Sequence, residues 1–220
     1  MTESEARDEI CRVGKSLFER GYVHATAGNI SVCLDDGFLI TPTDACLGFL
    51  QPKQLAKVDV DGRQVSGDKA SKTLALHRRI YESTRILREP ARCVLHTHST
   101  WSVALTLESH GEELLPAITP YYVMKVGRVP VVPYHRPGDP AAAEWVARAI
   151  ARYAAAGTEL RAVMLERLGP NVWHTTPAQA MAVLEELEET ARLWSLTGRR
   201  AAPLDAHQLE QLRAQFGASW

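Results

Sequence analysis

His96 and His98 flank Thr97 at the end of a short run, Cys93 to Thr97, that is typical of a β-strand. Residues i and i+2 of a strand point to the same face of a sheet, so we expect both imidazoles to reach one point. A converging pair of imidazoles suits Zn²⁺, Fe²⁺ or a similar ion, although two ligands do not complete a site. The motif alone therefore leaves two interpretations open: half of a metal site, or two strand histidines held by hydrogen bonds.

Three separate segments carry residues that can bind an anion. Gly28 permits a close backbone approach, and the amide of Asn29 can donate to an anion. Thr43 and Ser71 add hydroxyl groups, and Lys72 adds an ammonium group of the kind that binds phosphate. The same residue types are common in turns and helix caps, so phosphate binding and a structural role both stay open on these grounds.

The segment from Tyr134 to Asp139 is polar and rich in turn-forming residues. It is either a binding loop, which would include His135 and Arg136, or a well-capped connection to a helix that begins at Asp139-Pro140. A second connection, Arg167 to Pro170, follows a buried strand at the end of the sheet, where ligands often bind. Its side chains offer little chemistry of their own.

Composition excludes several classes of protein. The chain has 220 residues, with 25 Lys and Arg against 26 Asp and Glu, so no basic excess marks a nucleic-acid partner. No apolar run reaches the ~20 residues of a membrane helix, and the N-terminus lacks the layout of a signal peptide. The four cysteines are scattered without a CxxC motif. We therefore expect a cytoplasmic protein with reduced thiols and neither a nucleic-acid nor a membrane partner.

Hydrophobic periodicity predicts alternating helices and strands over residues 1–220, which we interpret as a single domain. Thr2 and Glu5 have capping-box spacing at the start of a helix that ends near Gly21, and a hairpin turns at Asp35-Asp36-Gly37. Further expected elements are a helix after Ser71, strands at 93–97, 129–132 and 161–165, and helices from Asp139 to about Ala155 and from Pro177 onward. Hairpins mixed with helices favour an α/β sandwich around a largely antiparallel sheet.

Two features of the C-terminal part complete this prediction. The helix from Pro177 is expected to expose an acidic face from Glu185 to Glu189. The tail, residues 203–220, has Leu209, Leu212 and Phe216 at helical spacing, and we expect it to pack on the body or on a neighbouring subunit.

The order of the motifs resembles the class II aldolase/adducin family over residues 5 to 197. Thr-Ala-Gly-Asn-Ile-Ser-Val, Leu-Ile-Thr-Pro-Thr, Val-Asp-Val-Asp-Gly, Ser-Lys, Leu-His, Val-Leu-His-Thr-His-Ser and Gly-Pro follow one another before an acidic helix. Within the family, residues 120–124 and 133–140 are similar to the branch of 3-oxo-tetronate 4-phosphate decarboxylases. The resemblance implies a three-layer α/β/α subunit, a fourfold homotetramer with active sites between subunits, and a divalent metal that stabilises an enediolate.

The chain departs from the family pattern at the metal site. His96 and His98 match the first two metal ligands, but Leu168 stands at the position of the third histidine. Thr73 stands at the position of the catalytic glutamate, where it supplies neither a base nor a carboxylate ligand. We expect a weak or absent metal (Zn, or Fe or Mn), with His135 as the first candidate for a replacement ligand.

The phosphate-binding positions of the family are better matched, by Asn29, Thr43, Ser71 and Lys72. Asp44 is the exception: it replaces a small or neutral residue of the phosphate loop and would repel a phosphate unless it is protonated or turned away. Tyr121 or Tyr122 falls near the tyrosine that reaches in from a neighbouring subunit in the aldolases. The residues expected to bind substrate are Gly28, Asn29, Thr43, Asp44, Ser71, Lys72 and Arg136.

These departures favour a repurposed enzyme that acts on a small carbonyl- or carboxylate-bearing molecule. His96 and His98 would bind a weakened metal or the substrate itself, and Lys72, Arg136 or Tyr121 would supply charge stabilisation and proton transfer. A variant has the two histidines hold Fe²⁺ for oxidative chemistry. The alternatives are an orthodox metal-dependent 3-oxo-tetronate 4-phosphate decarboxylase or sugar-phosphate aldolase, and a non-catalytic, adducin-like module.

Overall fold

The computed structural model describes residues 1–108 and 110–220. The helices are α1 (Glu3–Glu19), α2 (Leu74–Ser83), α3 (Thr100–Leu105), α4 (Pro140–Ala155), α5 (Pro177–Leu196) and α6 (Ala206–Phe216). The strands are β1 (Asn29–Leu34), β2 (Gly37–Ile40), β3 (Ala56–Asp59), β4 (Gln64–Ser66), β5 (Cys93–His96), β6 (Val131–Val132), β7 (Ala162–Leu165) and β8 (Gly169–His174). Short 3₁₀ turns and one π-helical turn, Tyr122–Val126, join them.

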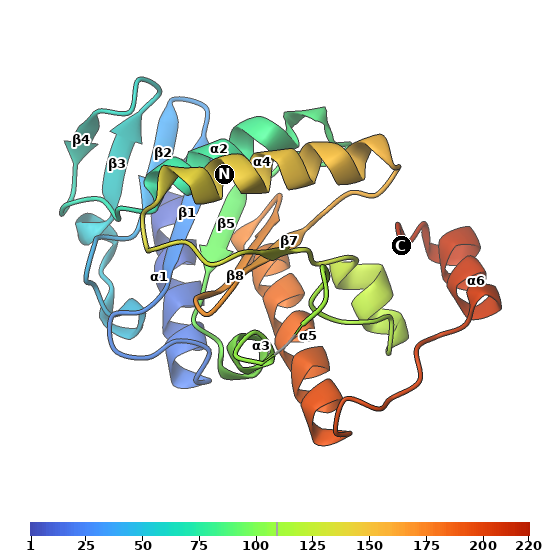
Figure 1. The fold of residues 1–220 in the computed structure, drawn as a ribbon. Coiled ribbons are helices and arrows are strands. Elements are labelled where there is room, and N and C mark those ends of the chain that lie inside the picture. Colours follow the sequence, from blue (N-terminus) through green and yellow to red (C-terminus); the bar gives the residue numbers. More distant parts are fainter. Residues whose placement is uncertain (109) are drawn as a thin grey trace.

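The strands of the described residues form one eight-stranded sheet in the order β4-β3-β2-β1-β5-β8-β7-β6. Neighbouring strands pair antiparallel, except that β6 runs parallel to β7. Helices α1 and α5 contact the sheet on one side, and α2 and α4 cover the other side (Figure 1). The predicted three-layer α/β/α sandwich around a mainly antiparallel sheet is therefore confirmed.

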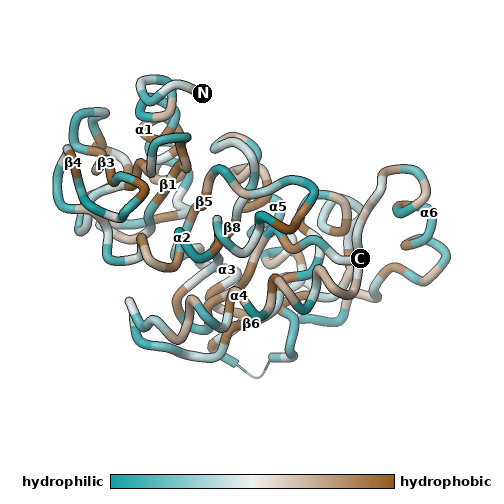
Figure 2. Tube along the Cα trace, turned by 90° about the horizontal axis from the view of Figure 1, so that it is seen from above, coloured by the Kyte–Doolittle hydropathy of each residue, from teal (hydrophilic) through white to brown (hydrophobic). Residues whose placement is uncertain are grey.

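Local signals in the sequence account for the first elements. Thr2 and Glu5 form the predicted capping box, in which the Glu5 carboxylate accepts from the Thr2 amide at 2.7 Å. Helix α1 then buries Ile10, Val13 and Leu17 against β1, as their helical spacing requires. Figure 2 shows the hydrophobic segments concentrated along the strands between α1 and α4.

Strand β8, which borders the candidate site, was not expected from the sequence. Residues 167–170 were interpreted as a connection, but only Arg167 and Leu168 lie in a turn, and Gly169 begins strand β8. The Gly-Pro pair and a buried Asn171 interrupt the apolar alternation that identifies a strand. Strand β8 nevertheless pairs with β5 through residues 171–174 and with β7 through residues 169–172, and thereby carries Asn171 into the interior of the sheet.

The prediction of a solvated acidic face on α5 is wrong for one residue, Glu188. Its carboxylate is buried and accepts from the backbone N–H groups of Trp101 and Ser102, at 2.6 and 3.0 Å. Those N–H groups lie at the start of α3, where the Ser99 hydroxyl bonds to Thr97 and leaves the helix end uncapped. Glu188 therefore acts as the cap of α3 from another helix, and burial raises its pKa.

We expect Glu188→Ala to lower the free energy of unfolding by about 1–3 kcal/mol, because two backbone donors would be left buried without an acceptor. Glu188→Gln keeps one acceptor oxygen, so its free energy of unfolding should fall less than that of Glu188→Ala. Glu189→Ala, on the exposed side of the same helix, is the matched control and should change stability by no more than about 0.5 kcal/mol. Urea unfolding followed by circular dichroism measures all three, and equal loss in Glu188→Ala and Glu189→Ala would contradict the capping role.

The tail folds as a helix, as the sequence predicts, and α6 lies at one end of the molecule in both views (Figures 1 and 2). Leu209 and Leu212, like Trp220, pack against a small buried cluster of Ala117, Val123 and Ala218. Whether α6 also contacts a neighbouring subunit stays a prediction. Within the described residues, no helix has both the length and the apolar character needed to cross a bilayer.

Candidate active site

A cavity of about 170 Å³ opens between the start of α2, the end of β5, the β7–β8 turn and the segment that leads into α4. One wall carries the polar side chains of Lys72, His96, His98 and Asn171. Much of the remaining lining is apolar and includes Val132, Pro133, Pro137, Pro140, Ala142, Ala143, Leu165 and Leu168. The cavity therefore suits a small ligand with a polar end and an apolar face.

Two glycines allow the strands to meet at this place. A Cβ atom at Gly28, which has a φ of +85°, would lie 2.9 Å from the carbonyl oxygen of His96. A Cβ atom at Gly169 would lie 1.9 Å from the carbonyl oxygen of Thr97. Side chains at either position would push β1 or the β7–β8 turn away from β5. The glycines thus fix the positions of His96 and of the turn that carries Leu168.

His96 is a buried, neutral imidazole held in one orientation. Its Nδ1 donates to the carbonyl oxygen of Pro170 at 3.0 Å, so Nε2 is the unprotonated nitrogen. Burial, followed by the nearby charge of His98, lowers the pKa of His96 to about 3. The ring therefore offers an acceptor at Nε2 throughout the neutral pH range.

The predicted convergence of the two histidines is present, although β5 ends at His96 and His98 lies beyond it. Their ring centroids are 5.0 Å apart, and the exposed His24 lies 6.4 Å from His98. His135 also lines the cavity, but its Nδ1 bonds to the carbonyl of Pro133 at 2.6 Å. The described residues contain no group of three His, Cys, Asp or Glu side chains placed to hold one metal ion.

The residues present thus do not fit the metal site that the resemblance implies, with three imidazoles and a carboxylate. Leu168 and Thr73 line the cavity at the two places where that site needs an imidazole and a carboxylate. The Thr73 hydroxyl instead lies 3.0 Å from that of Ser71. Asp139 is the one carboxylate on the described wall, and it caps α4 by accepting from Ala141 at 3.0 Å.

The predicted substrate-binding residues fall into two groups. Lys72 and Arg136 line the cavity, and Arg136 lies 3.8 Å from Asp139. The remaining ones do not line it: Gly28, Asn29, Thr43, Asp44 and Ser71. Asn29 is nevertheless directly opposite His96 in the sheet, and Ser71 precedes Lys72. Tyr121 is 62% exposed and points away from the core, whereas Tyr122 is fully buried, so only Tyr121 is available to a neighbouring subunit.

Asn171 is the site residue that the sequence analysis missed. It lies opposite His96 on β8, is fully buried and lines the cavity. Neither atom of its amide has a hydrogen-bond partner among the described residues. An asparagine within an otherwise apolar strand was the available signal, and it could be used only once β8 was identified as a strand.

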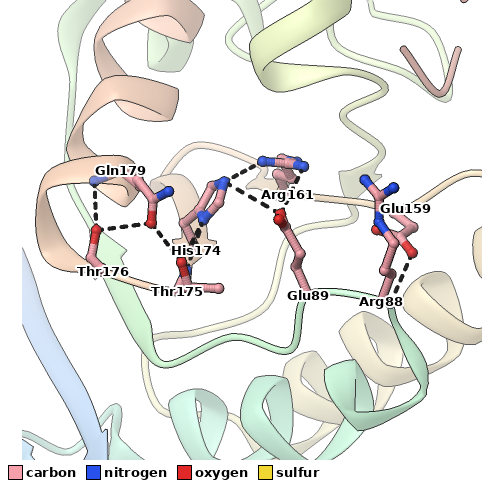
Figure 3. Close-up of polar contacts among 8 residues, drawn as sticks. All are labelled: Arg88, Glu89, Glu159, Arg161, His174, Thr175, Thr176 and Gln179. Atoms are coloured by element: carbon pink, nitrogen blue, oxygen red, sulfur yellow. Dashed lines mark hydrogen bonds and ion pairs between the residues drawn. The ribbon is translucent and has the colours of Figure 1, made fainter. Parts of the chain in front are cut away.

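A second polar cluster lies at the other end of β8 (Figure 3). Arg161 pairs with Glu89 at 3.2 Å and bonds to His174, while the Glu159 carboxylate accepts from the amide of Arg88 at 2.9 Å. These side chains form hydrogen bonds and ion pairs with one another, and the adjoining cavity has a volume of only about 10 Å³. The cluster therefore joins strands and loops and leaves no room for a ligand.

Comparison with known proteins identifies what the chain is similar to. The family model of the Class II Aldolase and Adducin N-terminal domain matches residues 8–195. The 3-oxo-tetronate 4-phosphate decarboxylase of Cupriavidus necator is 54% identical over 228 residues, which cover 100% of this chain and 99% of that protein. The enzyme of the same name from Escherichia coli K12 is 41% identical over 218 residues, covering 96% and 97% of the two chains.

Solved structures agree on the fold. YgbL from Escherichia coli superimposes with a TM-score of 0.86 at 39% identity, covering 96% of this chain and 99% of that chain. An L-fuculose 1-phosphate aldolase superimposes with a TM-score of 0.80 at 24% identity, covering 99% and 98%. The latter likeness concerns the fold alone.

Proposed function

Since this chain belongs to the class II aldolase and adducin family, we propose that it is a carbon–carbon lyase that decarboxylates a small 3-oxo acid. The first candidate substrate is 3-oxo-tetronate 4-phosphate, the compound named in relatives that align with the whole chain. The substrate and reaction are those of the alternative in the sequence analysis, the orthodox metal-dependent decarboxylase, and the comparisons support them better than a repurposed enzyme. Our proposal differs from that alternative in that no metal takes part.

The composition of the cavity wall is the observation that carries this proposal. The wall presents His96, His98 and Lys72 but no free carboxylate that could act as a base. Burial lowers the pKa of both imidazoles and makes them weak bases. Aldol cleavage must begin with removal of a hydroxyl proton, whereas a 3-oxo acid loses CO₂ without a base. The reaction needs only stabilisation of the negative charge that develops on the 3-oxo group. Decarboxylation is therefore the family chemistry that remains feasible with threonine at position 73.

Decarboxylation would proceed in two steps, loss of CO₂ and then protonation of C2. The bond between C1 and C2 breaks, CO₂ leaves, and the electron pair moves through C2–C3 onto the oxygen of C3. Hydrogen-bond donors of the polar wall stabilise this oxyanion, and Lys72 and Arg136 attract the phosphate of the substrate. C2 then takes up a proton from the ammonium group of Lys72, which water replenishes.

Release of CO₂ from 3-oxo-tetronate 4-phosphate is the direct test, measured with and without EDTA. We expect turnover above the spontaneous rate in both conditions, because no step uses a metal. A rate equal to the spontaneous one in both conditions would overturn the proposed function and leave the non-catalytic, adducin-like module.

We expect Lys72→Met to lower kcat/KM about 10- to 100-fold, because a hydrogen bond to a charged group contributes about 1.5–3 kcal/mol. Lys69→Met is the matched control, since Lys69 lies on the same loop but does not line the cavity. Steady-state assays of the two variants measure the difference. Equal kcat/KM values for Lys72→Met and Lys69→Met would show that Lys72 takes no part in binding or catalysis.

A second candidate is the repurposed enzyme of the sequence analysis, with a less polar carbonyl- or carboxylate-bearing substrate. The apolar wall favours it, because Leu168, Val132 and Leu165 offer nothing to the hydroxyl groups of a sugar acid. Assays with 2-methyl-3-oxobutanoate beside 3-oxo-tetronate 4-phosphate separate the two candidates. Faster turnover of the unphosphorylated acid would favour the repurposed enzyme.

We also propose a homo-oligomer, with a tetramer as the first candidate. Large apolar side chains are exposed at Phe49, Tyr121 and Phe216, which a neighbouring copy could cover. We expect light scattering at micromolar concentration to give a multiple of the 24.3 kDa chain mass. A mass equal to that of one chain would contradict this prediction.

A further inference from the structure

The amide of Asn171 is buried in the wall of the cavity without a hydrogen-bond partner. The residue is 0% exposed, and both Oδ1 and Nδ2 are unpartnered among the described residues. Buried polar groups of folded proteins are nearly always paired, and an exception calls for a ligand or an ordered water molecule. Since Asn171 lines the cavity, its missing partner is expected there.

Asn171 and His96 form a matched pair of hydrogen-bonding groups. They lie directly opposite each other on β8 and β5, so their side chains point to the same face of the sheet. Because His96 donates through Nδ1 to Pro170, its Nε2 is an acceptor. The wall thus places an amide donor, Nδ2 of Asn171, next to an imidazole acceptor.

A neighbouring donor and acceptor complement an α-hydroxy ketone, whose carbonyl accepts and whose adjacent hydroxyl donates. We propose that Nδ2 of Asn171 binds the carbonyl oxygen of such a unit while its hydroxyl donates to Nε2 of His96. This inference rests on the proposed function, because 3-oxo-tetronate 4-phosphate carries a hydroxyl on C2 beside the C3 carbonyl. Asn171 is then a catalytic residue, since its N–H stabilises the negative charge that reaches the C3 oxygen when CO₂ leaves.

The arrangement also gives a physical role to the departures from the family pattern. A metal held by three imidazoles would bind the carbonyl and hydroxyl oxygens of the ligand directly, as a Lewis acid. Here Leu168 takes the place of one imidazole, and an amide three residues further along the chain faces the same cavity. Two hydrogen bonds can hold the same two oxygens, although an amide stabilises an oxyanion less than a metal ion does.

The test uses Asn171→Leu, which keeps the shape of the side chain and removes its polar atoms. Two effects of opposite sign are expected. The variant without ligand should melt about 2–4 °C above the wild type, because an unpaired buried amide is replaced by an apolar group. Its affinity for dihydroxyacetone phosphate, the α-hydroxy ketone left after CO₂ loss, should fall at least about tenfold in EDTA. Affinity for inorganic phosphate should be unchanged.

Thr190→Val is the matched control. Thr190 is a fully buried polar residue of α5, outside the cavity, and its hydroxyl donates to Glu186 at 3.3 Å. This variant should lose stability and bind dihydroxyacetone phosphate as the wild type does. Calorimetric titration and thermal melting of the three proteins give both readouts.

Each result decides the inference independently of turnover. Equal affinity of wild type and Asn171→Leu for dihydroxyacetone phosphate, or no binding by the wild type, would overturn it. A melting temperature below that of the wild type would also overturn it, because the amide would then be paired inside the protein. If Asn171→Leu loses affinity as expected but the wild type releases no CO₂, the inference stands and the proposed function fails.

Discussion

The double variant Thr73→Glu, Leu168→His is expected to bind one zinc ion per chain, whereas the wild type should carry clearly less than one after dialysis. Both positions line the same cavity as His96 and His98, so the new carboxylate and imidazole would face the existing pair. A four-ligand zinc site contributes about 10–16 kcal/mol, or roughly 3 kcal/mol per ligand. Two added ligands should therefore raise zinc affinity on the order of 10⁴-fold.

Metal analysis after dialysis and competition with a chelator measure the difference. The single variants should fall between wild type and double variant, because each leaves the metal short of one ligand. His135→Ala in the wild-type background is the control for a replacement ligand. If the wild type holds one ion per chain and His135→Ala loses it, our interpretation of the metal site is wrong.

Much of the fold could be predicted because its signals are local. The capping box at Thr2 and the turn before Gly37 each occur within a few residues, and both are present in the structure. Strand β8 was missed because Pro170 and Asn171 break the alternation, and only pairing with β5 and β7 makes this segment a strand. The burial of Glu188 depends likewise on α3, which is distant in sequence.

In the candidate site, too, the features with a local sequence signal could be predicted, and those that depend on strand pairing could not. The HxH spacing predicts that His96 and His98 converge, and their rings do lie together. No local pattern indicates that Asn171 lies opposite His96, because that position follows from the register of β8 against β5. The predicted phosphate-binding segments carry suitable residue types, yet only Lys72 reaches the cavity wall, since the position of a loop depends on the elements packed around it.

The stability of the protein in acid depends on a histidine that the sequence indicates only as part of a helix. His77 of α2 is fully buried, with its Nδ1 2.7 Å from the Ser31 hydroxyl, which in turn lies 2.6 Å from the hydroxyl of Tyr81. Its Nε2 has no partner among the described residues. Burial, and then the charge of His96, lowers the pKa of His77 to about 3 from its ordinary 6.5.

The sign of the effect follows from proton binding. Between pH 6.5 and 3 the unfolded chain binds a proton at His77 that the folded chain does not, so acid favours unfolding. The stability is fully present above pH 6.5 and falls by about 1.4 kcal/mol per pH unit below it, or about 2 kcal/mol between pH 6.5 and pH 5.

His77→Asn removes the titrating ring and keeps a polar atom near the position of Nδ1, so its unfolding free energy should fall less steeply with acid than that of the wild type. His207→Asn, which replaces an exposed histidine on α6, is the control and should keep the wild-type slope. Comparing slopes between pH 7 and pH 5 cancels the carboxylates that all three proteins share, and it also cancels any constant loss of stability caused by the substitution. The slope difference therefore reports the burial of neutral His77 alone. Parallel curves for wild type and His77→Asn would mean that His77 takes up its proton within the folded protein.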